Sequence, residues 1–284
     1  MASTQWPVVA GVDGSPVGLG AVHWAVDEAV RFDRPLRIIH ALGAAGEDEP
    51  EADEYELTAK AAADARAWQP GLRVTTSIQS GGAAGILVEQ SRRASLVVVG
   101  SPAPDEFEAL PVEFLGTQLA AHAHCPVLVV HDARRWAGHA VVLPQHRPVL
   151  VGTDGSDRAQ PAVELAFAEA AARHTGLIVL RSWQEPPHRG GRSGGSGGSD
   201  RIAEAVGRSL AAELEPWRTK YPAVPVEPRT VRGAPAPALL AAADHALMLV
   251  LGPRGGGGFD GLRLGSVTQQ LLDRTPVPVL VARR

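Results

Sequence analysis

Short apolar runs alternate with Ala-rich amphipathic stretches along the whole chain. The runs at residues 8–12, 37–42, 96–100 and 126–130 consist largely of Val, Ile and Leu. Unbroken runs of this kind are typical of parallel strands that are buried on both faces, and the stretches between them are long enough for crossover helices. The pattern therefore predicts an α/β fold with a doubly wound parallel sheet and right-handed crossovers.

The same structural unit occurs twice in the sequence. VVAGVDGS (8–15) returns as VLVGTDGS (149–156), at an offset of 141 residues. The closing run PVLVV (126–130) returns as PVLVA (278–282), at an offset of 152 residues. A repeat of this length indicates two copies of one domain.

A glycine- and serine-rich tract explains the change of offset. GGRSGGSGGS (190–199) has no counterpart in the first half of the chain, and such a tract behaves as flexible coil. The sequence therefore predicts domains at residues 1–135 and 136–284, with the tract as a mobile loop in the second domain.

The first strand of each copy ends at an aspartate, at the edge of the sheet where doubly wound folds bind ligands. These residues are Asp13 and Asp154. Ser15 and Pro16 form a good N-cap and first-turn pair for the following helix, and Ser156 is expected to cap the second copy in the same way.

The segment at residues 251–267, LGPRGGGGFDGLRLGSV, carries the most informative chemistry. Gly252 and Gly255 bracket two residues, and nine more separate Gly255 from the pair Gly265-Ser266. Glycines let backbone N–H groups approach an anion without Cβ interference, and the helix that follows adds partial positive charge at its N-terminus. The segment therefore predicts a cradle for a polyphosphate.

This spacing after the fourth strand, together with an early strand that ends in Asp, resembles the universal stress protein family. The resemblance covers both copies and nearly the whole chain. It implies two tandem doubly wound domains of the adenine nucleotide alpha hydrolase-like type, each a five-stranded parallel sheet flanked by helices. Depending on the branch, members of such a family bind ATP, AMP or no nucleotide.

Carried over residue by residue, the resemblance implies a nucleotide site in the second copy. Asp154, with Thr153, would lie by the nucleoside, and a backbone group of Ser182 would recognise adenine. The residues that would hold the phosphates are Gly252, Gly255, Gly265, Ser266 and Val267.

The first copy departs from the family pattern. Gly100 is present, but Ala103 replaces the second glycine, and an ungapped alignment puts Glu113 and Phe114 at the positions of the Gly-Ser pair. A carboxylate there would repel a phosphate by about 1 kcal/mol for each close exposed charge pair, and by more if desolvated. The first copy is therefore expected to be a poor ATP site.

Two alternatives remain for this copy. Sliding the loop by three residues would offer Gly116 and Thr117 as the phosphate-binding pair, although this disturbs the apolar register of the helix. Asp13, Ala41 and Gly100 remain at the nucleoside end, so a weaker ligand without a triphosphate is compatible with the sequence.

Composition narrows the class of protein. A formal net charge of −4 gives no reason to expect nucleic acid or an anionic membrane as partner. No apolar stretch has the length of a membrane span, and the N-terminus lacks a signal-peptide pattern, so we expect a cytoplasmic protein. His122, His124 and Cys125 cluster at a helix end, but they offer two alternate ligands without an obvious third, and we expect no metal site.

These observations favour an ATP-binding regulator of a stress or dormancy response, with Mg²⁺ as a possible companion of the nucleotide. No catalytic constellation is visible, so catalytic residues are not assigned. The alternatives are a slow ATPase or nucleotidyl-transfer enzyme, and a structural pair of domains that binds no nucleotide. The last strands, 126–130 and 276–282, are expected to pair within the chain as a pseudo-dimer, and two chains could form a homodimer.

Overall fold

The computed structural model describes residues 5–43, 50–101, 115–131, 147–185, 197–257 and 263–283. The chain divides into two compact units. Unit 1 comprises Met1–Leu143 and Leu272–Arg284, and unit 2 comprises Pro144–Leu271. None of the helices in the described ranges is long and apolar enough to cross a membrane.

Unit 1 is built on a sheet with the strand order β3-β2-β1-β4-β5-β10. The first five strands are parallel, and β10 pairs antiparallel with β5. The pairing of the two closing strands that the repeat predicts is therefore confirmed. The strands are β1 (Val8–Val12), β2 (Leu36–Ala41), β3 (Val74–Gln79), β4 (Leu96–Ser101), β5 (Val127–His131) and β10 (Val279–Val281).

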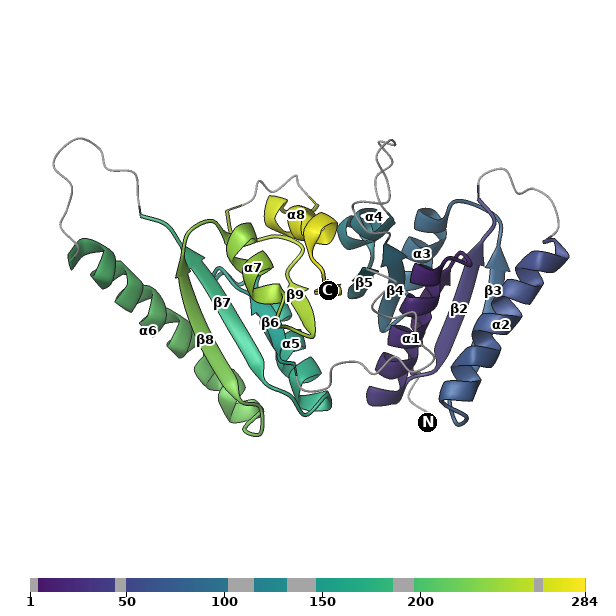
Figure 1. The fold of residues 1–284 in the computed structure, drawn as a ribbon, viewed down its shortest axis with the longest axis horizontal. Coiled ribbons are helices and arrows are strands. Elements are labelled where there is room, and N and C mark those ends of the chain that lie inside the picture. The colour runs from purple at the N-terminus through teal and green to yellow at the C-terminus, as the bar shows by residue number, and fades with distance from the viewer. Residues whose placement is uncertain are drawn as a thin grey trace. The chain divides into compact units, whose positions relative to one another are not determined.

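Helices cover both faces of this sheet (Figure 1). α1 packs on β1 and β4 and contacts α2, whereas α3 and α4 contact each other. Because β1, β4 and β5 are covered in this way, their Val-rich runs are almost wholly buried. The helices are α1 (Pro16–Arg31), α2 (Ala52–Trp68), α3 (Ala83–Ser91) and α4 (Leu115–His122).

Unit 2 repeats the arrangement with four parallel strands in the order β9-β6-β7-β8. The predicted doubly wound α/β fold is thus confirmed. Its strands are β6 (Val149–Gly152), β7 (Leu177–Trp183), β8 (Val226–Arg232) and β9 (Met248–Leu251). The helices are α5 (Gln160–Ala172), α6 (Gly197–Lys220), α7 (Pro235–Ala243) and α8 (Ser266–Arg274), the last of which crosses the boundary between the units.

The two helices that follow the first strands begin differently. The Ser15 hydroxyl accepts a hydrogen bond from the Gly18 amide at 3.0 Å and caps α1, as predicted. The prediction that Ser156 caps the second copy is wrong, because α5 begins only at Gln160 and has no side-chain cap. Proline favours the first turn of a helix, and it follows the serine directly in unit 1 but lies at Pro161 in unit 2.

The predicted loop at 190–199 is wrong at its C-terminal end. Residues 190–196 lie outside the described residues, and residues 197–199 already belong to the first turn of α6. Glycine costs little in a first turn, where the amides have no partner within the helix, so the amphipathic sequence that follows can extend the helix backwards.

Candidate functional site

A cavity of about 440 Å³ lies at the carboxyl edge of the unit 2 sheet. Its walls come from the ends of β6, β7 and β9 and from the first turns of α7 and α8. This is the edge at which doubly wound sheets place their ligands. All eight residues predicted for the second copy line it, namely Thr153, Asp154, Ser182, Gly252, Gly255, Gly265, Ser266 and Val267.

One part of the cavity is apolar. Leu180, Leu239 and Leu251 line it and are otherwise buried. Gly152 lies against two of these leucines, and a Cβ on it would come within 2.9 Å of a Leu239 methyl carbon. The absence of a side chain at Gly152 therefore allows β6 to pack closely against α7. A narrow apolar wall beside a strand end suits a flat ring.

The opposite part of the cavity is formed by the glycine loop, residues 252–266, of which 258–262 lie outside the described residues. Two hydrogen bonds fix the ends of this loop. The Gly265 amide donates to the Pro253 carbonyl at 2.8 Å, and the Thr268 hydroxyl donates to the Gly252 carbonyl, also at 2.8 Å. The loop thus places the N-terminus of α8 at the cavity, where the exposed N–H groups of the helix favour the binding of an anion.

Asp154 connects β6 to the glycine loop. Its Oδ1 accepts hydrogen bonds from the Ser156 amide and hydroxyl at 2.9 and 2.6 Å, and its Oδ2 accepts from the Gly256 amide at 2.6 Å. Burial alone would raise the pKa of Asp154, but the hydrogen bonds from Ser156 and Gly256 outweigh it and hold the pKa below its ordinary value. The carboxylate is therefore ionised and engaged at both oxygens.

The same carboxylate explains why residue 255 is glycine. A Cβ on Gly255 would lie 2.5 Å from the Asp154 Oδ2 atom. The sequence predicts that this glycine admits the anion of a ligand. The anion that approaches it in the structure is the side chain of Asp154.

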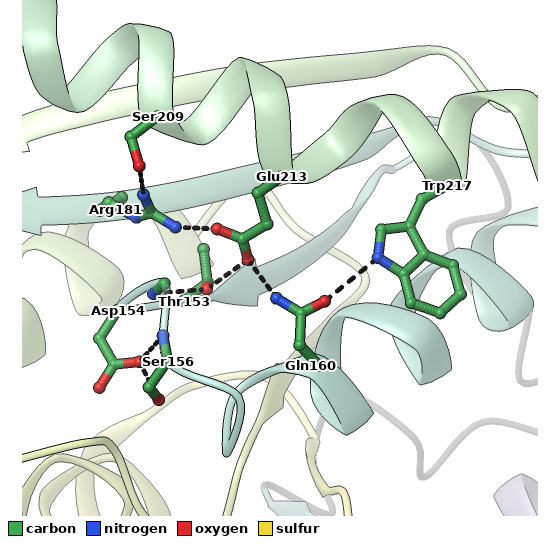
Figure 2. A network of polar contacts seen from close by, with 9 residues as sticks. Thr153, Asp154, Ser156, Gln160, Arg181, Ser209, Glu213 and Trp217 are labelled. Atoms are coloured by element: carbon green, nitrogen blue, oxygen red, sulfur yellow. Dashed lines mark hydrogen bonds and ion pairs between the residues drawn. The ribbon is translucent and has the colours of Figure 1, made fainter.

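A buried polar network supports the Asp154 turn, residues 153–156 (Figure 2). It lies on the face of the sheet opposite the cavity. The Thr153 hydroxyl donates to Glu213 Oε1 at 2.9 Å and accepts a hydrogen bond from the Gly155 amide at 3.1 Å. Glu213 Oε2 forms an ion pair with Arg181, whose guanidinium also donates to Ser209. The side chains of Arg181 and Glu213 are only 8% and 10% exposed.

The network continues from α6 to α5. The Gln160 amide donates to Glu213 Oε1 at 3.1 Å, and the Trp217 indole donates to the Gln160 side-chain oxygen at 3.3 Å (Figure 2). This network was not predicted from the sequence. Its one local signal is Arg181, a charged residue within the otherwise apolar run of β7, which requires a partner when buried.

Unit 1 places its three predicted residues at the corresponding edge of its sheet. Asp13 follows β1 and accepts hydrogen bonds from the Ser15 amide and hydroxyl, Ala41 ends β2, and Gly100 lies in β4. The departures from the family pattern, at Ala103, Glu113 and Phe114, lie outside the described residues.

The alternative phosphate-binding pair of unit 1 lies within α4. A Cβ on Gly116 would come within 2.9 Å of Val129 in β5, so this glycine allows the helix to pack against the sheet. At the repeat offset of 152 residues Gly116 corresponds to Thr268 rather than to Gly265. Gly116 therefore already has a structural reason to be glycine.

Metal-binding capacity in this pocket comes from one carboxylate. The described ranges hold no group of three or more His, Cys, Asp or Glu side chains that could bind an ion by themselves. Mg²⁺ in nucleotide sites is typically held by one or two carboxylates together with the phosphates. Asp154 fits that limited role.

Both units match one protein family. The model of the universal stress protein family matches residues 7–131 and again residues 145–283. The chain belongs to the universal stress protein family. A universal stress protein of Mycolicibacterium smegmatis is 33% identical over 301 residues, which cover 99% of this chain and 98% of that protein.

Solved structures of universal stress proteins agree with this fold. A crystal structure from Archaeoglobus fulgidus has a TM-score of 0.65 at 17% identity and covers 99% of this chain and 98% of that chain. A universal stress protein solved in complex with cAMP is 31% identical, with a TM-score of 0.37, and covers 49% of this chain and 97% of that chain.

Proposed function

We propose that unit 2 binds ATP and that its nucleotide state regulates a stress or dormancy response through a protein partner. The observation that carries the proposal is the convergence, in one cavity, of an apolar wall and a glycine loop that ends at a helix N-terminus. The first part suits a nucleobase and the second a chain of phosphates. Membership of the universal stress protein family adds support.

In this proposal the base lies between Leu180, Leu239 and Leu251, with the backbone at Ser182 as its polar partner. The phosphates lie along the glycine loop toward Gly265 and Ser266, whose hydroxyl is a donor. A Mg²⁺ ion would be held mainly by the phosphates, with Asp154 as the candidate protein ligand, and it would offset part of their charge.

A binding protein fits the site better than an enzyme does. A general base works best with a pKa near the working pH. Asp154 is the carboxylate that lines this pocket in the described ranges, and hydrogen bonds from Ser156 and Gly256 hold its pKa below the ordinary value, which makes it a weak base. Slow hydrolysis as a by-product of binding is compatible with this chemistry, and efficient turnover is not.

Titration calorimetry with ATP on the wild type and on Gly265→Glu tests the proposal. We expect about one ATP per chain for the wild type. Gly265→Glu gives unit 2 the residue found at Glu113 in unit 1, and repulsion in a partly desolvated loop should weaken binding more than tenfold. Gly265→Ala is the control, because a Cβ here would meet the Arg254 Cα at 3.3 Å without adding charge.

The number of ATP molecules bound per chain distinguishes the competing functions. Two equivalent ATP sites per chain would show that the first copy binds nucleotide despite its acidic loop. A wild type that binds neither ATP nor adenosine would leave the structural pair of domains as the better reading. A homodimer of whole chains stays a prediction, and analytical ultracentrifugation that finds only monomer would contradict it.

A further inference from the structure

The buried ion pair of unit 2 lies behind the cavity. Leu180 and Ser182 of β7 line the cavity, and successive residues of a strand point to opposite faces, so Arg181 between them points to the other face. There it meets Glu213 and Ser209 of α6 (Figure 2). Neither charged side chain can touch a ligand in the cavity.

This pair nevertheless contacts the turn that carries Asp154. A Cβ on Gly155 would lie 2.7 Å from a guanidinium nitrogen of Arg181, so the turn rests directly on the arginine. Gly155 has a φ of +81°, which only glycine adopts without strain. Glu213 holds Thr153, two residues before Gly155, because its Oε1 accepts from the Thr153 hydroxyl at 2.9 Å. The ion pair therefore contacts the turn at both neighbours of Asp154, Thr153 and Gly155.

The first unit shows that the fold of the turn does not require these charges. Gly14 has the same φ of +81°, and its turn rests on Leu57, whose methyl carbon would be 2.8 Å from an added Cβ. The repeat aligns Val12 with Thr153, His40 with Arg181, Leu57 with Ser209 and Ala61 with Glu213, so the carboxylate of the unit 2 ion pair has no counterpart at this position of unit 1.

Buried ion pairs are weak contributors to stability, since apolar residues of similar volume usually serve as well. We infer that the pair acts on the pocket instead. Arg181 and Glu213 are positioning residues that set the Asp154 turn against the glycine loop, where Asp154 meets the Gly256 amide. The inference rests on the proposed nucleotide site, and it means that the affinity of this site for its ligand depends on two residues that do not line the cavity.

Glu213→Ala is the first test, because it gives unit 2 the residue that unit 1 has at Ala61. We expect the affinity for ATP and for adenosine to fall together, by about tenfold, because the turn lies at the nucleoside end. Gly265→Glu, by contrast, should weaken ATP far more than adenosine. Glu215→Ala is the matched control, an exposed glutamate on the same helix, and should change neither affinity.

The double variant Arg181→Leu/Glu213→Leu separates positioning from folding. It leaves no buried charge unpaired, so its Tm should stay close to that of the wild type. The Thr153 hydroxyl has still lost its acceptor, so both affinities should remain reduced. Wild-type affinity in the double variant, or in Glu213→Ala, would overturn the inference.

Hydrogen exchange provides a readout that needs no ligand. The Gly155 amide donates to the Thr153 hydroxyl, and the Ser156 amide donates to Asp154. Both amides should exchange faster in Glu213→Ala and in the double variant, whereas the amides of α8 should not change. If the wild type binds neither ATP nor adenosine, the proposed function fails, and this exchange alone decides whether the pair holds the turn. Unchanged exchange would refute that role.

Discussion

A glycine stands at the end of the fourth strand in both units, within β4 as Gly100 and directly after β9 as Gly252, but for different reasons. In unit 1 a Cβ on Gly100 would lie 2.6 Å from a Val17 methyl carbon and 2.8 Å from the Val17 backbone carbon and oxygen. In unit 2 the nearest atoms to a Cβ on Gly252 are the carbonyl oxygens of Arg254 and Arg158, at 3.2 and 3.3 Å. Packing against α1 therefore accounts for Gly100 without any ligand.

The other end of the loop differs as well. Thr268 ties α8 to the Gly252 carbonyl, and the aligned residue of unit 1 is Gly116, which has no hydroxyl and packs on β5. A motif glycine is thus weak support for a nucleotide site unless its partners are also present. Unit 2 has the Thr268 hydroxyl as such a partner, whereas in the part of unit 1 that the structure describes its place is taken by Gly116, and packing accounts for Gly100.

Gly100→Ala should give the largest effect on stability. Besides a Val17 methyl carbon, the atoms in the way are the backbone carbon and oxygen of Val17 in α1, which cannot move aside, so overpacking should lower the free energy of unfolding of unit 1 by about 3 kcal/mol. Gly252→Ala should cost about 1 kcal/mol or less, because its neighbours need to yield by only a few tenths of an ångström. Denaturant melts combined with hydrogen exchange of the β1 and β6 amides would measure each unit separately.

The same two variants should affect ATP binding in the opposite order. Gly252→Ala should weaken ATP binding, while Gly100→Ala should leave it unchanged as long as unit 2 stays folded. Loss of half the ATP sites in Gly100→Ala would contradict the comparison, because it would mean that unit 1 also binds nucleotide.

Thr268→Val should have an intermediate effect on unit 2. The Thr268 hydroxyl is buried and donates to the Gly252 carbonyl, and losing such a bond costs about 1 kcal/mol. The expected loss of ATP affinity is about fivefold, since the loop is no longer tied at its first residue. Thr268→Ser retains the donor and is the control. Calorimetry that gives equal affinities for the Val and Ser variants would show that the tie does not shape the loop.

Local patterns predicted the fold and most of the pocket wall. Strand runs, crossover helices and the glycine spacing are properties of short segments, and the ligand-binding edge follows from the order of the elements. For this reason Asp154 and Gly265 could be placed at one edge of the sheet in advance, whereas Ser182 was assigned through the family resemblance alone.

Contacts between distant segments could not be predicted in this way. Glu213 lies 60 positions after Thr153, and nothing local in α6 indicates that its carboxylate accepts the threonine hydroxyl. The start of α5 failed for another reason. Two capping signals compete there, and Pro161 decides against Ser156. The contact between Gly255 and Asp154 could not be predicted either, because Asp154 lies about 100 positions earlier, whereas the predicted role of Gly255 in holding a phosphate stays a prediction.

Mild acid should destabilise unit 1 more than unit 2, and this is the smallest of the expected effects. Burial lowers the pKa of His23 in α1 to about 4, against a backbone hydrogen bond with Leu19 that raises it. The unfolded chain, with an ordinary pKa near 6.5, binds the proton first, so the free energy of unfolding of unit 1 falls as the pH drops from about 6.5 to about 4. Burial also lowers the pKa of His131 in β5, which adds a dependence of the same sign.

Unit 2 has Glu164 at the position aligned with His23, where it pairs with the exposed Lys220 at 3.1 Å. Hydrogen exchange measured separately for each unit between pH 7 and pH 4 should therefore show faster exchange in unit 1 at a higher pH than in unit 2. His23→Gln should flatten the profile of unit 1 without abolishing it, because His131 still titrates. A variant whose profile matches the wild type would mean that the His23 ring is hydrated enough to take up its proton in the folded state.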